Sequence, residues 1–277
     1  MNCSICKLIT KKSIDSTVFY CNECDHYQYF PTKVEETFNH ATISESLENL
    51  RNKNAVTIFR QYSNIFPVGI RFVEVGAGTG YLIRKFQQKA QSVTAVDVDN
   101  TFEEFLKEQG VNFVHLKHDE MKTFENYDCF LSSHFLEHIK DPVGYLKTLK
   151  KSKVKYLVIE VPSSEGIIFR ISKVLYPLGF RTFWDRMFQK ESNSPHLQYF
   201  SIKSAERLLS INNYTIVKRI NIPLVDKFPN FKRIAATESK FISIIISLLL
   251  PMLEFINFLT NTSDVKVYFA ELQNSDF

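Results

Sequence analysis

The sequence has no dominant charge: 34 Lys and Arg residues stand against 30 Asp and Glu residues, a net charge of +4 over 277 residues. This balance excludes a strong overall positive field that would attract nucleic acid, but it does not exclude a local basic patch. No charged segment followed by an apolar one opens the chain, so we expect no secretory signal and a cytoplasmic, reducing compartment. Internal repeats and low-complexity tracts are also missing. With 44% hydrophobic and 23% charged residues, the composition excludes a disordered, collagen-like or coiled-coil chain.

Cysteine is scarce as well, and its five residues need a reason other than disulfides in a reducing compartment. Four of them form two C-x-x-C pairs, Cys3 with Cys6 and Cys21 with Cys24. Each pair can turn two thiolates toward one point, and two pairs predict a closed, structural zinc site. A redox pair and an iron–sulfur site are the alternatives. The fifth cysteine, Cys129, lies in an apolar run and is expected in the core.

The residues around these cysteines do not have the charge of a nucleic-acid module. Residues 1–40 contain four lysines and five acids, a net of about −1. Phosphate contact needs the opposite sign. We therefore expect residues 1–35 to form a small zinc ribbon whose metal supplies most of its folding free energy.

Short apolar runs alternate with helical stretches after residue 70. Strands are predicted at 71–75, 92–96, 112–115, 127–131 and 156–161, with helices at 81–88, 101–107 and 142–151 between them. This alternation predicts an α/β fold, a doubly wound and mostly parallel sheet. A helix over 203–210 and strands over 214–222 and 265–272 complete the sheet. A further helix is predicted over 44–66.

The chain thus divides into three parts. A ribbon at 1–35 and a connecting helical region at 36–69 precede a large domain at 70–277, which has insertions at 163–195 and 223–262. The first insertion is aromatic and basic and is expected to form a lid or to shape the substrate site.

The second insertion contains an apolar segment, 241–259, with fourteen apolar residues out of nineteen. Pro251, Glu254 and Asn257 interrupt it, which argues against a membrane span. We expect a helical hairpin packed on its own domain or on a second subunit, as in a homodimer. Peripheral contact with a membrane surface, and hence membrane association, is the alternative.

One predicted strand breaks into glycines, in the run from Phe72 to Leu82. Glycine permits a tight turn and a close approach of a ligand to the backbone. The spacing is G-x-G-x-G, with Tyr81 where a dinucleotide fingerprint needs its third glycine, so a nicotinamide cofactor is disfavoured. Glu74 precedes the first glycine by two residues, where it would repel a pyrophosphate and attract an ammonium group.

Two acids follow the next strands. Asp97 closes the second strand, and an acid at this place can accept both hydrogens of a ribose diol. Asp119 follows the third strand, where it can accept an adenine amino hydrogen. The implied ligand has an amine, a ribose and an adenine but no phosphate.

These motifs, together with Leu136-Glu137-His138-Ile139-Lys140-Asp141-Pro142 and His196-Leu197-Gln198-Tyr199-Phe200-Ser201, resemble the class I S-adenosylmethionine-dependent methyltransferases. The resemblance spans residues 70–220 and favours the small-molecule branch. It implies a Rossmann-like, seven-stranded sheet. It assigns the methionine part of the cofactor to Glu74, Gly76, Ala77, Gly78, Thr79 and Gly80, the ribose to Asp97 with Val98, the adenine to Asp119 and the methyl end to Ser132 and Ser133.

Three histidines fall where members of this family line the pocket: His134, His138 and His196. Methyl transfer is an in-line displacement that depends on orientation, and a hydroxyl or acidic carbon acceptor also needs a base. Imidazole has a suitable pKa for that role. Glu137 is a fourth candidate. The alternative is that each histidine only hydrogen-bonds a backbone group.

A four-cysteine ribbon on such a domain resembles bacterial enzymes that methylate sugars or other small metabolites, including those of surface-polysaccharide pathways. We therefore expect methyl transfer to a small polar acceptor, a sugar or a sugar nucleotide. Two alternatives stay open. One is a zinc-ribbon ribosomal RNA (guanine) methyltransferase, whose basic ribbon is missing here, and the other is a non-catalytic scaffold that only binds the cofactor.

Overall fold

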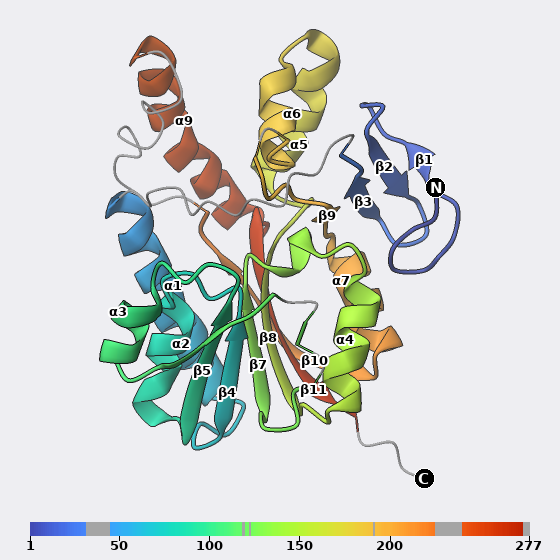
Figure 1. Ribbon diagram of the computed structural model, residues 1–277. Coiled ribbons are helices and arrows are strands. Elements are labelled where there is room, and N and C mark those ends of the chain that lie inside the picture. Colours follow the sequence, from blue (N-terminus) through green and yellow to red (C-terminus); the bar gives the residue numbers. More distant parts are fainter. Residues whose placement is uncertain (32–44, 118–119, 122, 191, 225–239, 274–277) are drawn as a thin grey trace.

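The structure, a computed structural model, describes residues 1–31, 45–117, 120–121, 123–190, 192–224 and 240–273 (Figure 1). Its centre is a seven-stranded sheet in the order β10-β11-β8-β7-β4-β5-β6. The strands are β4 (Arg71–Val75), β5 (Ser92–Asp97), β6 (Asn112–His115), β7 (Cys129–Ser133), β8 (Tyr156–Pro162), β10 (Tyr214–Ile222) and β11 (Val265–Leu272). All ladders from β8 to β6 are parallel, and β11 runs antiparallel to both its neighbours. The predicted Rossmann-like fold is confirmed.

Helices cover both faces of this sheet, which explains why its inner strands are mostly apolar. On one face lie α1 (Glu45–Ser63), α2 (Tyr81–Phe86) and α3 (Glu103–Glu108), and on the other α4 (Pro142–Lys151) and α7 (Ile202–Ile211) (Figure 1). Each face has its own apolar core cluster. The strand β8 is buried at every position, as a strand between two helical layers must be.

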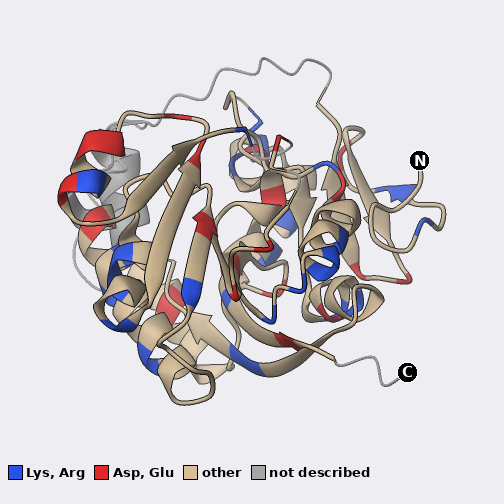
Figure 2. Cartoon of the chain, turned by 60° about the horizontal axis from the view of Figure 1, so that its bottom comes forward, with Lys and Arg blue, Asp and Glu red and all other residues tan. Residues whose placement is uncertain are grey.

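The amino-terminal ribbon has strands β1 (Lys11–Lys12), β2 (Val18–Cys21) and β3 (His26–Tyr29). Its sheet is completed by β9 (Gln198–Tyr199), a strand from much later in the chain, which pairs antiparallel with β3. The ribbon and the segment around residue 198 therefore share one small sheet. Acidic and basic residues are interspersed over the described helices and loops, without a large region of one sign in the view of Figure 2.

Three helical segments follow β8: α5 (Ile167–Leu175), the short helix η3 (Tyr176–Leu178) and α6 (Arg181–Met187). They lie beyond the sheet, next to the ribbon (Figure 1). An aromatic core joins them to β3 and β9, and its large members are Tyr27, Tyr29, Phe169, Trp184, Phe188 and Tyr199. Large aromatic side chains contribute much of the burial energy of such a contact.

A buried amide, that of Gln198, joins the ribbon to the backbone at Ile139, which follows β7 in the chain. Its Oε1 accepts hydrogen bonds from the Ser4 hydroxyl (2.9 Å) and from His26 Nε2 (2.7 Å). Its Nε2 donates to the carbonyl oxygen of Ile139 at 3.0 Å. Gln198 is 2% exposed, so water does not compete for these bonds.

The apolar segment 241–259 does not form the expected hairpin. It lies in one helix, α9 (Lys240–Leu259), which continues through Pro251. Asn257 is buried on one side of α9, where its amide donates to Asp264 Oδ2 and its Oδ1 accepts from the Ile167 N–H. The opposite side exposes Leu249, Met252, Phe255, Phe258 and Leu259.

This exposed side is where the expected dimer or membrane contact would have to form. No helix in the described part of the chain has the length and apolarity needed to cross a membrane. Residues 225–239 of the second insertion lie outside the described residues.

We predict that Gln198→Ala lowers the free energy of unfolding by about 2–4 kcal/mol, because it leaves Ser4, His26 and a carbonyl without their buried partner. Urea unfolding measures the change. Gln88, which is exposed, provides the matched control, and Gln88→Ala should stay within about 0.5 kcal/mol of the unmodified protein. Equal effects of the two substitutions would contradict the role of Gln198.

Candidate functional site

The glycine loop, residues 76–80, connects β4 to α2. Gly76, Gly78 and Gly80 have φ angles of 72°, 51° and 69°, in the left-handed region. A Cβ atom added at Gly76 would lie 2.8 Å from Phe135 Cδ2, and one at Gly80 would lie 2.6 Å from Leu106 Cδ2. The loop therefore requires glycine for its backbone conformation and for its close packing.

Asp97, at the end of β5, is tied to this loop. Its Oδ2 accepts a hydrogen bond from the Gly78 N–H at 2.7 Å, and its Oδ1 accepts one from the Asp99 N–H at 3.0 Å. The side chain is 4% exposed, and the following Val98 is half-buried. The structure thus brings Asp97 and the glycine loop together, while Asp119 lies outside the described residues.

Glu74 is a buried carboxylate in β4, two residues before the first glycine of the loop. It is 1% exposed, and its Oε2 accepts a hydrogen bond from the Ile83 N–H at 2.8 Å. Burial raises the pKa of Glu74 from its ordinary 4.5 to about 8, against the effect of that hydrogen bond, and the charges of Glu160 and Asp97 raise it further. A cation in this place would stabilise the ionised form.

Two further polar atoms of the predicted cofactor set are buried without a hydrogen-bond partner within the described part of the chain. They are Thr79 Oγ1 in the glycine loop and Ser132 Oγ at the end of β7. Ser133, by contrast, donates its hydroxyl to Glu160 Oε2 at 2.7 Å. Since buried polar groups are nearly always paired, the two unpaired hydroxyls fit a site that holds a polar ligand.

The chain after β7 places histidines among buried acids. His134 has a φ of 51°, a rare conformation for a residue other than glycine. Its Nδ1 lies 3.2 Å from Glu137 Oε1, and its Nε2 lies 3.2 Å from Glu160 Oε1. Carboxylates only accept hydrogen bonds, so both ring nitrogens carry hydrogen and the ring is charged.

The pKa values agree with this assignment. Burial would lower the pKa of His134, but Glu160 and Glu137 outweigh it and raise the pKa to about 9. Burial likewise opposes ionisation of Glu137, but His134 holds the pKa of Glu137 down, at about 2, and it also lowers the pKa of Glu160.

Sequence reasoning missed Glu160. The available signal was a single acid inside the otherwise apolar run of β8.

The short helix η2 (Leu136–His138) and the segment before β9 bring two more imidazoles to Glu137. His138 Nδ1 lies 2.9 Å from the Pro195 carbonyl oxygen, and His196 Nδ1 lies 2.8 Å from the Met187 carbonyl oxygen. The two ring centroids are 5.0 Å apart. Burial, and then the neighbouring His138, lower the pKa of His196 to about 3, so its ring is neutral.

All four predicted catalytic residues therefore meet in one place. We refer to His134, Glu137, His138, Glu160 and His196 as the imidazole–carboxylate cluster. It adjoins the glycine loop through Phe135, the residue against which Gly76 packs.

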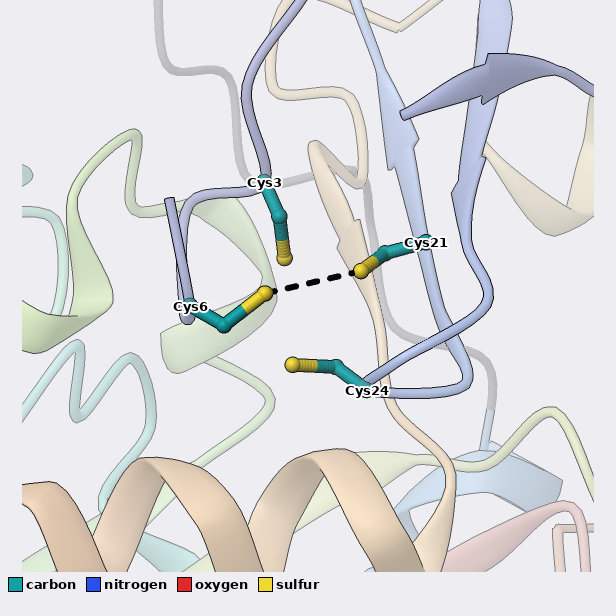
Figure 3. A group of neighbouring side chains, drawn as sticks. All are labelled: Cys3, Cys6, Cys21 and Cys24. Carbon is teal, nitrogen blue, oxygen red and sulfur yellow. Dashed lines mark hydrogen bonds between the residues drawn. The ribbon is translucent and has the colours of Figure 1, made fainter. Parts of the chain in front are cut away.

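The four cysteines of the ribbon also converge (Figure 3). One sulfur from each of Cys3, Cys6, Cys21 and Cys24 lies within 4.8 Å of the other three, and Cys6 Sγ is 3.6 Å from Cys21 Sγ. Burial raises the pKa of the Cys3 thiol to about 11. Four sulfurs in this arrangement fit a tetrahedral zinc ion, which would hold them as thiolates. Cys129 lies buried in β7, as expected for a core residue.

The sheet order, the glycine loop after its central strand and the acid at the end of the next strand define the class I methyltransferase fold. The family comparison agrees, because residues 46–219 match the model of a family described as a methyltransferase domain. This match covers more than half of the chain, and the chain belongs to that family. The prediction of an S-adenosylmethionine-dependent methyltransferase is thereby confirmed.

Solved structures share the fold at low sequence identity. The YcgJ protein of Bacillus subtilis aligns with a TM-score of 0.53 and 12% identity over 80% of this chain and 100% of its own. The magnesium protoporphyrin IX methyltransferase of Synechocystis PCC 6803, solved with bound S-adenosylhomocysteine, aligns with a TM-score of 0.54 and 10% identity over 85% of this chain and 90% of its own. No curated protein matches the chain in sequence.

We predict that Glu74→Gln stabilises the protein without cofactor at high pH. The folded-state pKa of Glu74, about 8, exceeds its ordinary value of 4.5, so ionisation costs stability as the pH rises from about 4.5 to 8. The variant should gain roughly 1–3 kcal/mol in free energy of unfolding at pH 8 and nothing at pH 4. Denaturant unfolding at both pH values measures this. Glu125→Gln, at an exposed acid, is the control; a gain independent of pH in Glu74→Gln would refute the assignment.

Proposed function

We propose that the protein transfers the methyl group of S-adenosylmethionine to a small polar acceptor, a sugar, a sugar nucleotide or a related precursor of surface polysaccharide. The observation that carries this proposal is the position of the imidazole–carboxylate cluster, which adjoins the glycine loop through Phe135. A site for a hydroxyl-rich acceptor needs many hydrogen-bonding groups, and this cluster supplies three imidazoles and two carboxylates.

The cofactor would be held by the residues that the family resemblance assigns. Glu74 and the loop Gly76, Ala77, Gly78, Thr79 and Gly80 would receive the methionine part, Asp97 and Val98 the ribose, and Asp119 the adenine. Ser132 and Ser133 would lie at the methyl end. The uncompensated Glu74 carboxylate fits the ammonium group, and the unpaired hydroxyls of Thr79 and Ser132 fit a polar ligand. When bound, the cofactor supplies a sulfonium-linked methyl group.

The chain's own residues then orient the acceptor. His138 and His196 donate their Nδ1 hydrogens to backbone carbonyls, so Nε2 is the nitrogen of each ring that is left for the acceptor. We assign contact with the acceptor to these two rings and to Glu137. Because His134 is already protonated and bonded at both nitrogens, we assign it the positioning of Glu137 instead of the role of base.

We assign the cysteine quartet to a structural zinc ion. Four protein sulfurs leave no coordination position for a substrate, so the ion would stabilise the ribbon and take no part in the chemistry. The RNA alternative gains no support from the ribbon, because the three lysines among its described residues, Lys7, Lys11 and Lys12, are balanced by three acids, Asp15, Glu23 and Asp25.

The cofactor assignment is tested at Asp97. Asp97→Asn should weaken S-adenosylhomocysteine binding about 10- to 100-fold, since a charged hydrogen bond to a ribose hydroxyl is worth about 1.5–3 kcal/mol. Isothermal titration calorimetry measures the dissociation constants. Asp99→Asn, two residues further on, should keep the affinity within about twofold. If both variants bind like the unmodified protein, the ribose assignment is wrong.

The acceptor class is tested by a screen for S-adenosylhomocysteine release with sugar nucleotides, free sugars and ribosomal RNA fragments. We expect turnover with a sugar nucleotide, little changed between low and high salt. Turnover with RNA alone, falling steeply with salt, would replace the proposal by the RNA alternative. Cofactor binding without turnover on any acceptor would favour the scaffold alternative.

A further inference from the structure

The imidazole–carboxylate cluster contains a second set of groups that can ligate a metal, apart from the cysteine quartet. One donor atom each of Glu137, His138 and His196 lies within 4.8 Å of the other two. Around a metal ion with bonds near 2.1 Å, such donors stand about 3–3.5 Å apart. A contraction of at most about 1.3–1.8 Å would therefore bring the three side chains to bonding distance.

The orientation of the two imidazoles matches that of metal ligands. His138 donates its Nδ1 hydrogen to the Pro195 carbonyl (2.9 Å), and His196 donates its own to the Met187 carbonyl (2.8 Å). Carbonyl oxygens only accept, so Nδ1 carries the hydrogen in each of these bonds, and Nε2 is the nitrogen of each ring that is left to ligate a metal. Ligating histidines commonly have their other nitrogen fixed by a backbone carbonyl in this way.

The carboxylate of Glu137 adds an independent observation. The side chain is fully buried, and its Oε1 is engaged by His134. Its Oε2 has no hydrogen-bond partner among the residues that the structure describes. An unpaired buried carboxylate oxygen is costly, and the same carboxylate group lies beside His196, with 4.0 Å between Glu137 Oε1 and His196 Nε2. A cation would satisfy all three acceptors at once.

We propose that Glu137, His138 and His196 bind a divalent transition-metal ion, with open coordination positions for an oxygen atom of the acceptor. Imidazole and carboxylate together suit Zn²⁺, Mn²⁺, Fe²⁺ or Co²⁺ better than the all-oxygen sites that Mg²⁺ and Ca²⁺ prefer. Three protein ligands leave positions open, as in catalytic metal sites. The acceptor would then be one whose hydroxyl or carboxylate oxygen can bind a metal.

The ion's place in catalysis rests on the proposed function, because a bound metal lowers the pKa of a hydroxyl that it contacts. The binding of the ion itself is independent of the proposed function. His134 and Glu160 do not bind the ion in this arrangement; they orient its ligand Glu137. His134 contacts Glu137 Oε1 and is itself oriented by Glu160.

The test uses the full chain loaded with zinc and dialysed against Co²⁺. Zinc binds thiolates more tightly than cobalt does, so the cysteine quartet keeps its zinc. We expect elemental analysis to find one cobalt per chain in addition to that zinc, with visible absorption typical of nitrogen and oxygen ligands. Glu137→Gln and His196→Gln should each weaken cobalt binding more than about 100-fold and leave the zinc in place. His115→Gln, at an exposed histidine on β6, should keep the cobalt.

A second measurement covers the case in which a variant does not fold. In the unmodified cobalt protein, the Nδ1 hydrogens of His138 and His196 should give two strongly shifted, solvent-exchangeable proton signals. The proposal is overturned if no cobalt binds beyond the zinc at millimolar Co²⁺, if cobalt persists in both folded variants, or if the two signals are missing. S-adenosylhomocysteine binding, measured on the same samples, shows separately whether the proposed function fails.

Discussion

The buried amide of Gln198 is the interaction on which the arrangement of the site depends. It hydrogen-bonds Ser4 and His26 of the ribbon on one side and the backbone after η2 on the other. Because the amide is almost fully buried, none of these groups can exchange it for water without loss of stability. The ribbon therefore fixes the segment that carries Glu137 and His138, and a metal held by the cysteines would stabilise the site without contacting it.

The imidazole–carboxylate cluster contains groups that lower the stability of the fold and that the surrounding contacts have to offset. Burying Glu137 and Glu160 costs free energy that the charged His134 between them offsets. His134 also holds a left-handed backbone, a conformation that costs about 1–3 kcal/mol outside glycine. Glu74 adds a buried carboxylate with no compensating charge close enough to keep its pKa normal. Backbone strain and buried ionisable groups thus gather at the carboxyl edge of the sheet, where they can serve binding instead of stability.

Much of the fold could be predicted because the physics is local. Alternating apolar runs and helical stretches predicted the strands β4, β6, β10 and β11 at their observed bounds, since burial between two helical layers selects apolar residues. The glycine loop and Asp97 meet because the carboxyl ends of neighbouring parallel strands share one edge. The hairpin expected at 241–259 was wrong because a proline does not always end a helix, and α9 continues through Pro251.

The rest of the site depends on contacts between distant segments. His138 and His196 were both candidates, but nothing in their spacing shows that their rings are 5.0 Å apart or that carbonyls of Pro195 and Met187 orient them. Their juxtaposition follows from the contact between η2 and the segment before β9, where the Leu197 N–H donates to the Glu137 carbonyl oxygen at 2.8 Å, a long-range contact that no local pattern encodes. Glu160 was missed for the same reason, because only its contact with His134 distinguishes it from any other acid in a strand.

The pairing of β3 with β9 also bears on how the chain folds during synthesis. His26 and Gln198 are 172 residues apart, so the ribbon emerges from the ribosome long before the strand that completes its sheet. At a translation rate of about 5–20 residues per second, the edge of β3 stays unpaired for roughly 10–30 s before β9 is made. An unpaired strand edge beside the aromatic rings of Tyr27 and Tyr29 invites association with other chains during that interval. The last of the four cysteines is residue 24, so all of them are available early in synthesis. Metal binding at that stage would give the nascent ribbon a defined structure before β9 has been made.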